Sequence, residues 1–193
     1  VYVTLLNASI TSSGGNVSVI GQGGGSGFSG NNNGVYVSST GIISATGDGT
    51  LTVMGTGGSG SGHSNYGILL SGSNSQITSI NGNLSLIGQG GGSGVSFANY
   101  GIYFDDNSIV STTGTGTLSI LGTGGNSTGT GNFNIGVLVD LSNVSTASNN
   151  LSITGQGGGS INSTGNNSGV HLASSSNISA GGSGLVSILG VAG

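Results

Sequence analysis

A short run that alternates hydrophobic and polar residues recurs along the whole chain. It is clearest at residues 16–23, where Ser18 separates Val17 from Val19 and a Gly-Gln-Gly sequence follows shortly after. Five similar runs come later, and their residues equivalent to Val17 are Leu51, Leu84, Leu118, Leu151 and Val186. The steps between these positions are 34, 33, 34, 33 and 35 residues, and self-similarity at such a period indicates a solenoid or another repeat array.

Two more hydrophobic runs lie in every repeat, so each repeat predicts three short strands. The first run reads Val1-Tyr2-Val3 at the start of the chain, and its outer residues share one face by period-two alternation. The second run centres on Ile10, Ile43, Ile77, Val110, Val144 and Ile178. Two residues later comes a small residue suited to a tight corner: Ser12, Ala45, Ser79, Thr112, Thr146 or Ala180.

A glycine precedes the first run of each later repeat and divides the chain into similar units. The units are 1–33, 34–66, 67–100, 101–135, 136–168 and 169–193, which we expect to form a single domain. Short hydrophobic bursts, β-branched residues and frequent glycine exclude a helical solenoid, and the blades of a propeller need about 40 residues or more. The sequence therefore predicts an all-β parallel β-helix of six coils of about 33 residues, stacked about 4.8 Å apart.

The third strand of each coil leads into the longest loop of the repeat. These loops have nearly constant length and contain Phe28, Phe97 and Phe133, so we expect a folded ridge rather than disordered linkers. An Asn-Gly or Tyr-Gly step closes the first three of them, and we expect its glycine to supply a positive φ angle. Odd coils carry Asn and Gln beside the third strand where even coils carry Thr, a pattern that predicts hydrogen bonds along the stack.

Composition narrows the range of partners. The chain has no Lys, Arg, Pro, Cys or Trp, and its net charge is −4. Without basic residues it lacks the electrostatic footprint of nucleic-acid binding or of attachment to anionic membranes. No stretch approaches the roughly 20 continuous apolar residues of a membrane span, so we expect neither nucleic-acid binding nor membrane insertion.

The Gly/Asn/Ser/Thr-rich strand repeats resemble those of large bacterial surface proteins, the filamentous-haemagglutinin-like and autotransporter-passenger group. The resemblance lies in composition and period, and it covers the whole chain. It implies a right-handed parallel β-helix, secretion to the cell surface or beyond, and a role in adhesion or in building surface structure.

Three carboxylates are the candidate cation ligands. Asp105 and Asp140 follow the first strand at equivalent positions of adjacent coils, with Asp106 beside the former. Close carboxylates share a proton or hold a cation, so Ca²⁺ is the candidate cofactor and solvated turn residues are the alternative. Paired carboxylates also serve glycoside hydrolysis, but no Lys, Arg or His stands in the equivalent rungs. The sequence therefore favours a protein that is not an enzyme.

The middle residues of the first strands form one outward column: Tyr2, Tyr36, Leu69, Tyr103, Leu138 and His171. We expect its tyrosines and its histidine to make lateral contacts with a neighbouring solenoid or to bind glycans, although packing between rungs explains the column equally well. Among the Asn-x-Ser/Thr triplets, those at Asn126, Asn162 and Asn166 lie in loops and are the candidate glycosylation sites.

The two ends of the repeat array carry the predicted assembly interface. An open β-helix edge needs a cover, and the last coil has hydrophobic residues where earlier coils have Asn, Thr or Gln. The expected interface residues are Val1, Tyr2, Val3, Leu185, Leu189 and Val191. We expect identical chains to stack head to tail, as subunits of an extracellular fibre or segments of a shaft. The alternatives are an adhesin shaft that binds glycans and a polysaccharide-active enzyme.

Overall fold

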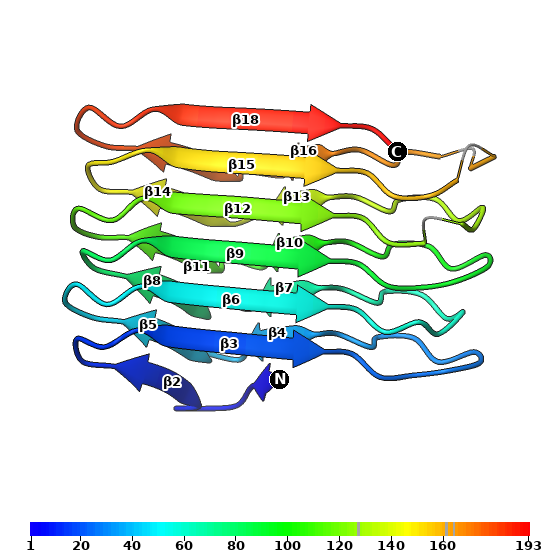
Figure 1. The fold of residues 1–193 in the computed structure, drawn as a ribbon, viewed down its shortest axis with the longest axis horizontal. Coiled ribbons are helices and arrows are strands. Elements are labelled where there is room, and N and C mark those ends of the chain that lie inside the picture. Colours follow the sequence, from blue (N-terminus) through cyan, green and yellow to red (C-terminus); the bar gives the residue numbers. More distant parts are fainter. Residues whose placement is uncertain (127, 161, 164) are drawn as a thin grey trace.

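A computed structural model describes residues 1–126, 128–160, 162–163 and 165–193. Its strands wind into a parallel β-solenoid (Figure 1). No helix with the length and hydrophobicity of a membrane span occurs among these residues. The strands are β1 (Tyr2–Val3), β2 (Ser9–Ser12), β3 (Val17–Gln22), β4 (Val35–Ser38), β5 (Ile42–Ala45), β6 (Leu51–Thr56), β7 (Ile68–Ser71), β8 (Gln76–Ser79), β9 (Leu84–Gln89), β10 (Ile102–Asp105), β11 (Ile109–Thr112), β12 (Leu118–Thr123), β13 (Val137–Asp140), β14 (Asn143–Thr146), β15 (Leu151–Gln156), β16 (Val170–Ala173), β17 (Asn177–Ala180) and β18 (Val186–Val191).

Three strands form each of six coils, and equivalent strands stack into three parallel sheets. Sheet A contains β1, β4, β7, β10, β13 and β16; sheet B contains β2, β5, β8, β11, β14 and β17; sheet C contains β3, β6, β9, β12, β15 and β18. The chain rises through the coils in the right-handed sense, with sheet C nearest the viewer in Figure 1. The predicted fold class is confirmed.

Equivalent residues of successive coils lie directly above one another. In sheet C, Val17 pairs with Leu51 and Leu51 with Leu84, as the repeat predicts. Alternate residues of each strand point inward and form a narrow continuous core, in which Leu51 and Val53 are 0% exposed. Each aliphatic side chain buried in this way contributes roughly 1.5–3 kcal/mol, so the core columns hold the coils together.

The small residues after the second run lie inside the corner between sheets B and C, as predicted. Where the small residue is serine or threonine, its hydroxyl group can also bond the chain that turns the corner. Ser79 Oγ donates to the Gly82 carbonyl oxygen at 2.8 Å, and Thr112 Oγ1 donates to the Gly116 carbonyl oxygen at 2.8 Å. These bonds satisfy buried main-chain groups that no strand pairs.

Glycines line the corner between sheets C and A. The fifth residue of each sheet C strand is glycine, and a Cβ atom at Gly122 would lie 2.2 Å from the Gly136 carbonyl oxygen. Gly136 itself has no room for a side chain, because a Cβ there would lie 2.5 Å from the main-chain nitrogen of Gln156. The chain can therefore turn this closely only with glycine on both sides of the corner.

The glycines that close the loops do not have the predicted positive φ angles, which occur earlier in the loops. The glycines that begin the coils, such as Gly67, do not have left-handed backbone. Four left-handed residues stand three positions before a coil start, namely Asn31, Ser64, Ala98 and Phe133, with φ angles of 57°, 63°, 54° and 56°. Other left-handed residues, such as Gly25 and Gly92, lie nearer the beginning of the loops. The prediction was wrong because close approach between neighbouring segments, rather than backbone torsion, requires glycine at the coil starts.

Candidate functional surfaces

A ladder of asparagines runs through the base of the loop ridge, one residue per coil. Its members are Asn32, Asn65, Asn99, Asn134 and Asn167. Nδ2 of Asn32 donates to Oδ1 of Asn65 at 2.7 Å, that of Asn65 to Asn99 at 3.0 Å, and that of Asn99 to Asn134 at 2.9 Å. Asn65, Asn99 and Asn134 are 0% exposed. The ladder fixes the register of the ridge, and sequence reasoning missed it although each member stands two residues before a coil start.

A second, exposed set of amides confirms the predicted alternation beside sheet C. Asn83 Oδ1 accepts the main-chain N–H and the hydroxyl of Thr117 at 3.0 and 2.9 Å. Asn16 Oδ1 accepts the main-chain N–H of Thr50 at 2.9 Å. An odd coil thus caps the even coil above it, which explains why the repeat alternates in pairs of coils.

Three tyrosines gather where the loop ridge meets sheet A. Tyr66 and Tyr100, which come just before β7 and β10, stack with ring centroids 5.1 Å apart. Tyr103, on β10, meets both rings edge-on, at 5.7 Å from Tyr66 and 5.3 Å from Tyr100. All three rings are partly buried. We call this group the tyrosine cluster.

Two carboxylates border the tyrosine cluster. Burial raises the pKa of Tyr66 and of Tyr103, and raises the pKa of Tyr100 to about 12. The negative charge of Asp105 adds to the rise at Tyr66 and Tyr103, and that of Asp140 to the rise at Tyr100 and Tyr103. The phenol groups therefore remain protonated donors at neutral pH. Aromatic rings beside carboxylate acceptors are the groups that contact the C–H faces and the hydroxyls of a sugar.

The predicted outward column of sheet A is confirmed in register, but it is not a continuous aromatic strip. Tyr2 pairs with Tyr36, and their rings meet edge-on at 5.6 Å. Leu69 separates Tyr36 from Tyr103, and another leucine separates Tyr103 from His171. Lateral contact or glycan binding through this column stays a prediction.

The predicted cation ligands do not form a coordination cluster. The parallel register of β10 and β13 pairs Phe104 with Val139, so that Asp105 and Asp140 follow at equivalent positions of adjacent coils. Asp106 lies in the following turn with a φ of 53°. Asp105 Oδ2 accepts the hydroxyl of Ser71 at 3.4 Å. Within the described ranges no three His, Cys, Asp or Glu side chains group as metal ligands. Calcium binding stays a prediction that this geometry does not favour.

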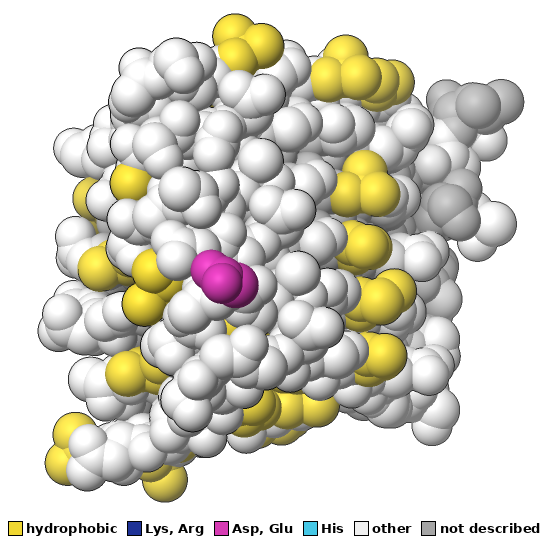
Figure 2. Space-filling model, turned by 60° about the vertical axis from the view of Figure 1, so that its left-hand side comes forward, with side chains coloured by type: hydrophobic (Ala, Val, Ile, Leu, Met, Phe, Trp, Pro, Cys, Tyr) yellow, Lys and Arg dark blue, Asp and Glu magenta, His cyan; other side chains and the backbone are white. Residues whose placement is uncertain are grey.

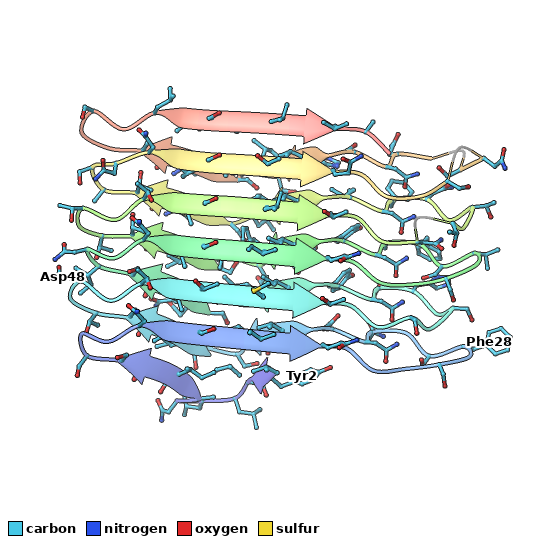
Figure 3. The ribbon with its side chains drawn as sticks, viewed as in Figure 1. Tyr2, Phe28 and Asp48 are labelled. Carbon is cyan, nitrogen blue, oxygen red and sulfur yellow. The ribbon has the colours of Figure 1, made fainter. Side chains whose placement is uncertain are left out.

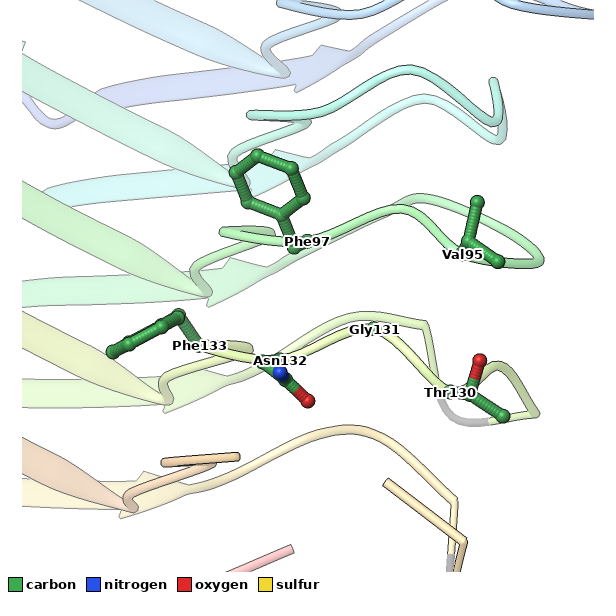
Figure 4. Close-up of a pocket in the computed structure, with 6 residues that line it drawn as sticks. All are labelled: Val95, Phe97, Thr130, Gly131, Asn132 and Phe133. Atoms are coloured by element: carbon green, nitrogen blue, oxygen red, sulfur yellow. The ribbon is translucent and has the colours of Figure 1, made fainter. Parts of the chain in front are cut away.

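The loop ridge is folded, as predicted, and exposes hydrophobic side chains. Phe28, 96% exposed, stands at the tip of the first loop, on the side of the solenoid opposite Asp48 (Figure 3). Val95 and Phe97 of one loop and residues 130–133 of the next enclose a shallow hollow of about 340 Å³ (Figure 4). Phe133 combines a left-handed backbone with an exposed fraction of 46%, an unfavourable combination for an aromatic residue.

The outer face of sheet C carries a hydrophobic column that sequence reasoning missed. It consists of the fourth residue of each strand: Ile20, Met54, Ile87, Leu121, Thr154 and Leu189. Ile20 is 69% exposed and Leu121 is 43% exposed. Figure 2 shows hydrophobic side chains in a row that crosses the stacked coils. The available signal was a hydrophobic residue at a position that alternation assigns to solvent.

The geometry does not favour one of the three predicted glycosylation sites. Asn126 is only 4% exposed, and its Nδ2 donates to the carbonyl oxygens of Gly94 and Ser96 at 3.1 and 2.8 Å. A glycan on this nitrogen would have to displace both bonds. Asn162 and Asn166 are exposed and remain candidates. Ser127, the middle residue of the Asn126 triplet, and Thr164, the last residue of the Asn162 triplet, lie outside the described residues.

The predicted assembly residues are divided between the end coils and the side of the solenoid. At the first coil, Val1 and Tyr2 are 41% and 61% exposed, whereas Val3 is buried. In the last coil, Leu185 is 64% exposed and precedes β18. Leu189 and Val191 belong to the outer face of sheet C, since they pair with the outward Thr154 and Gln156. An end-on contact therefore cannot be made by these residues alone.

Comparisons of the chain with protein-family models, with curated proteins and with solved structures give no match. Functional inference for this chain therefore rests on its own residues and their geometry.

Proposed function

We propose that the protein is a non-enzymatic structural shaft, part of an extracellular fibre or cell-surface rod, in which further coils of the same register cover its end coils. The covering coil belongs either to a second copy or to a longer chain, because the contact is the same in both cases. The resemblance of the repeats to filamentous-haemagglutinin-like and autotransporter-passenger proteins supports the extracellular location.

The exposed interior of the last coil carries this proposal. Its inward residues Leu172, Val186 and Ile188 are 45%, 37% and 44% exposed. The equivalent residues one coil below, which are Val139, Leu151 and Ile153, are all 0% exposed. A stacked coil would bury these three side chains as completely as their equivalents, which is a favourable hydrophobic contribution.

Hydrogen bonding is left open at the same edge. In each earlier coil the residue equivalent to Val186 donates its main-chain N–H to the coil above; Leu151, for example, donates to the Leu185 carbonyl oxygen at 2.9 Å. In this register the Val186 N–H points away from the coil below. Within the part of the chain that the structure describes, Asn167 is the last asparagine of the ladder, and its Nδ2 donates to Ser163 Oγ at 2.8 Å instead of to another ladder residue. An unpaired parallel edge with matched amides favours addition of another coil of the same kind.

Substitution of Val186 by proline tests end-on stacking with little cost to the chain itself. Val186 is the first residue of the edge strand β18, a place where proline is tolerated because its N–H has no partner. We expect the wild-type chain to elongate with rising concentration in sedimentation velocity and electron microscopy, and Val186→Pro to stop elongation. Val186→Thr, which keeps the N–H, is the control. Wild-type particles that stay monomeric at the highest soluble concentration would refute the proposal.

Glycan binding is a second candidate function, favoured by the tyrosine cluster and its two carboxylates. If the shaft is an adhesin, Tyr100→Ala should abolish binding to the glycans that the wild type retains on an array. Tyr100→Phe should keep it, and Phe28→Ala, an exposed aromatic residue at the tip of the first loop, serves as control. Equal binding by Tyr100→Ala excludes this site. If the protein is instead a polysaccharide-active enzyme, the wild type should cleave a polysaccharide. The variants Asp105→Asn and Asp140→Asn should then lose this activity.

A further inference from the structure

We infer that the outer face of sheet C is a pairing surface for a second copy of the chain, so that shafts associate side by side. This contact uses a long face of the solenoid and is independent of the end coils. It requires neither the end-on stacking proposed above nor any ligand.

The face consists of three parallel columns with no charged residue in them. The hydrophobic column of Ile20 to Leu189 lies in the middle, and serines or threonines at the second strand position lie on one side. The other side alternates amide and hydroxyl groups and ends in a hydrophobic residue; it consists of Gln22, Thr56, Gln89, Thr123, Gln156 and Val191. On a sheet face that served only solvation, polar residues would fill the middle column.

The dimensions of the face fit a specific interface at its lower size limit. Each sheet C strand has six residues, or about 20 Å at about 3.3 Å per residue, and six strands at about 4.8 Å span about 29 Å. The product is about 570 Å² for one partner and about 1,140 Å² for two. A specific protein–protein interface should exceed about 1,000 Å² in total, so two such faces cover enough area only when they meet along nearly their whole length.

A second copy is the partner that this face fits. An uncharged face meets its own copy without like-charge repulsion, whereas a charged partner would lose hydration and gain no ion pair. A two-fold axis that lies between the two faces, parallel to the strands and at the middle of the stack, gives an isologous contact. It would set Ile87 against Leu121, and Ile20 against Leu189, of the other copy. The outer face of sheet A, which carries Asp105 and Asp140, would repel its own copy.

Mass measurement of four full-length variants separates this contact from end-on stacking. In the Val186→Pro background, which blocks elongation, we expect a dimer of 36.4 kDa, twice the 18.2 kDa of the chain. Adding Leu121→Asp should raise the dissociation constant at least tenfold and yield monomers, because it buries a charge against a hydrophobic residue. Adding Thr78→Asp, which places the same charge on the outer face of sheet B, should leave the dimer intact.

A second substitution at Leu121 tests whether misfolding, rather than loss of the contact, produces the monomers. Leu121→Thr should weaken the dimer less than Leu121→Asp, and it should fold normally because Thr154 occupies the equivalent position one coil above. Circular dichroism checks the fold of each variant. A Val186→Pro chain that is monomeric at all concentrations overturns lateral pairing but leaves end-on stacking standing. Wild-type particles that stop at dimers and are dispersed by Leu121→Asp support pairing and refute elongation.

Discussion

Replacement of Asn99 tests whether the asparagine ladder holds the ridge together. Its Oδ1 accepts the main-chain N–H and the Nδ2 of Asn65 at 3.1 and 3.0 Å, and its Nδ2 donates to Asn134 Oδ1 at 2.9 Å. In Asn99→Leu, the main-chain N–H and the Nδ2 of Asn65 both lose this acceptor in the buried ladder. Each buried orphan donor costs about 1–3 kcal/mol, so the expected loss in the free energy of unfolding is about 2–6 kcal/mol. Asn134 Oδ1 keeps its bond from the Asn99 main-chain N–H, at 3.2 Å.

The stability of Asn99→Asp should depend on pH, which tests the same ladder in a second way. The new carboxyl still accepts from Asn65, but its second oxygen faces Asn134 Oδ1, so only the protonated form can donate there. The folded-state pKa should therefore lie above the unfolded value of about 3.9. Since protons bind more tightly to the folded state, the variant is least destabilised below about pH 4 and loses stability as the pH rises through the folded pKa.

Urea unfolding followed by far-UV circular dichroism, at about pH 3.5 and about pH 7, measures both effects. Asn16→Asp is the control, because Asn16 accepts one main-chain N–H on the exposed side of the stack, and we expect a cost below about 1 kcal/mol. A loss under about 0.5 kcal/mol for Asn99→Leu, or a cost of Asn99→Asp that does not change with pH, would refute the role of the ladder.

Three further predictions concern the corner, the core and the tyrosine cluster. Gly122→Ala should cost more than about 2 kcal/mol in urea unfolding, since its Cβ would meet a carbonyl oxygen at 2.2 Å, whereas Gly24→Ala, with no atom within 4 Å, should change stability little. Phe104→Ala should cost about 3–5 kcal/mol because Phe104 is fully buried, and the exposed Phe97→Ala much less; thermal melts compare them. Because the pKa of Tyr100 is raised from 10.0 to about 12, its contribution to stability is complete below about pH 10 and is lost as the pH rises towards 12. Unfolding at stepped alkaline pH should show a smaller loss for Tyr100→Phe.

The strands and their register could be read from the sequence because both periods are explicit in it. Alternation places Val17 and Val19 on one face, and the repeat of 33 to 35 residues places Leu51 above Val17. The asparagine ladder, the left-handed residues and the buried Asn126 were missed or misjudged because they depend on the path of the loops. Glycine-rich loops have no periodicity that specifies their path.

The candidate surfaces were predicted only in part. The outward column of sheet A followed from alternation, but Tyr66 and Tyr100 stand outside the strands, so their contact with Tyr103 could not be foreseen. The hydrophobic column of sheet C was visible in principle, since Ile20 interrupts an otherwise polar face. It was overlooked because a hydrophobic residue inside a strand is usually assigned to the core.

Each coil contacts only the coils directly above and below it. The number of coils can therefore change while the cross-section of the solenoid stays the same. Excision of residues 67–135, the third and fourth coils, would join Tyr66 to Gly136, which is equivalent to Gly67, and leave every remaining rung a compatible neighbour. Duplication of the same segment would extend its reach equally simply. Loss of a single residue within a strand, by contrast, would turn hydrophobic side chains to the wrong face. Gene rearrangements that add or remove whole coils are therefore the changes that this architecture can best survive.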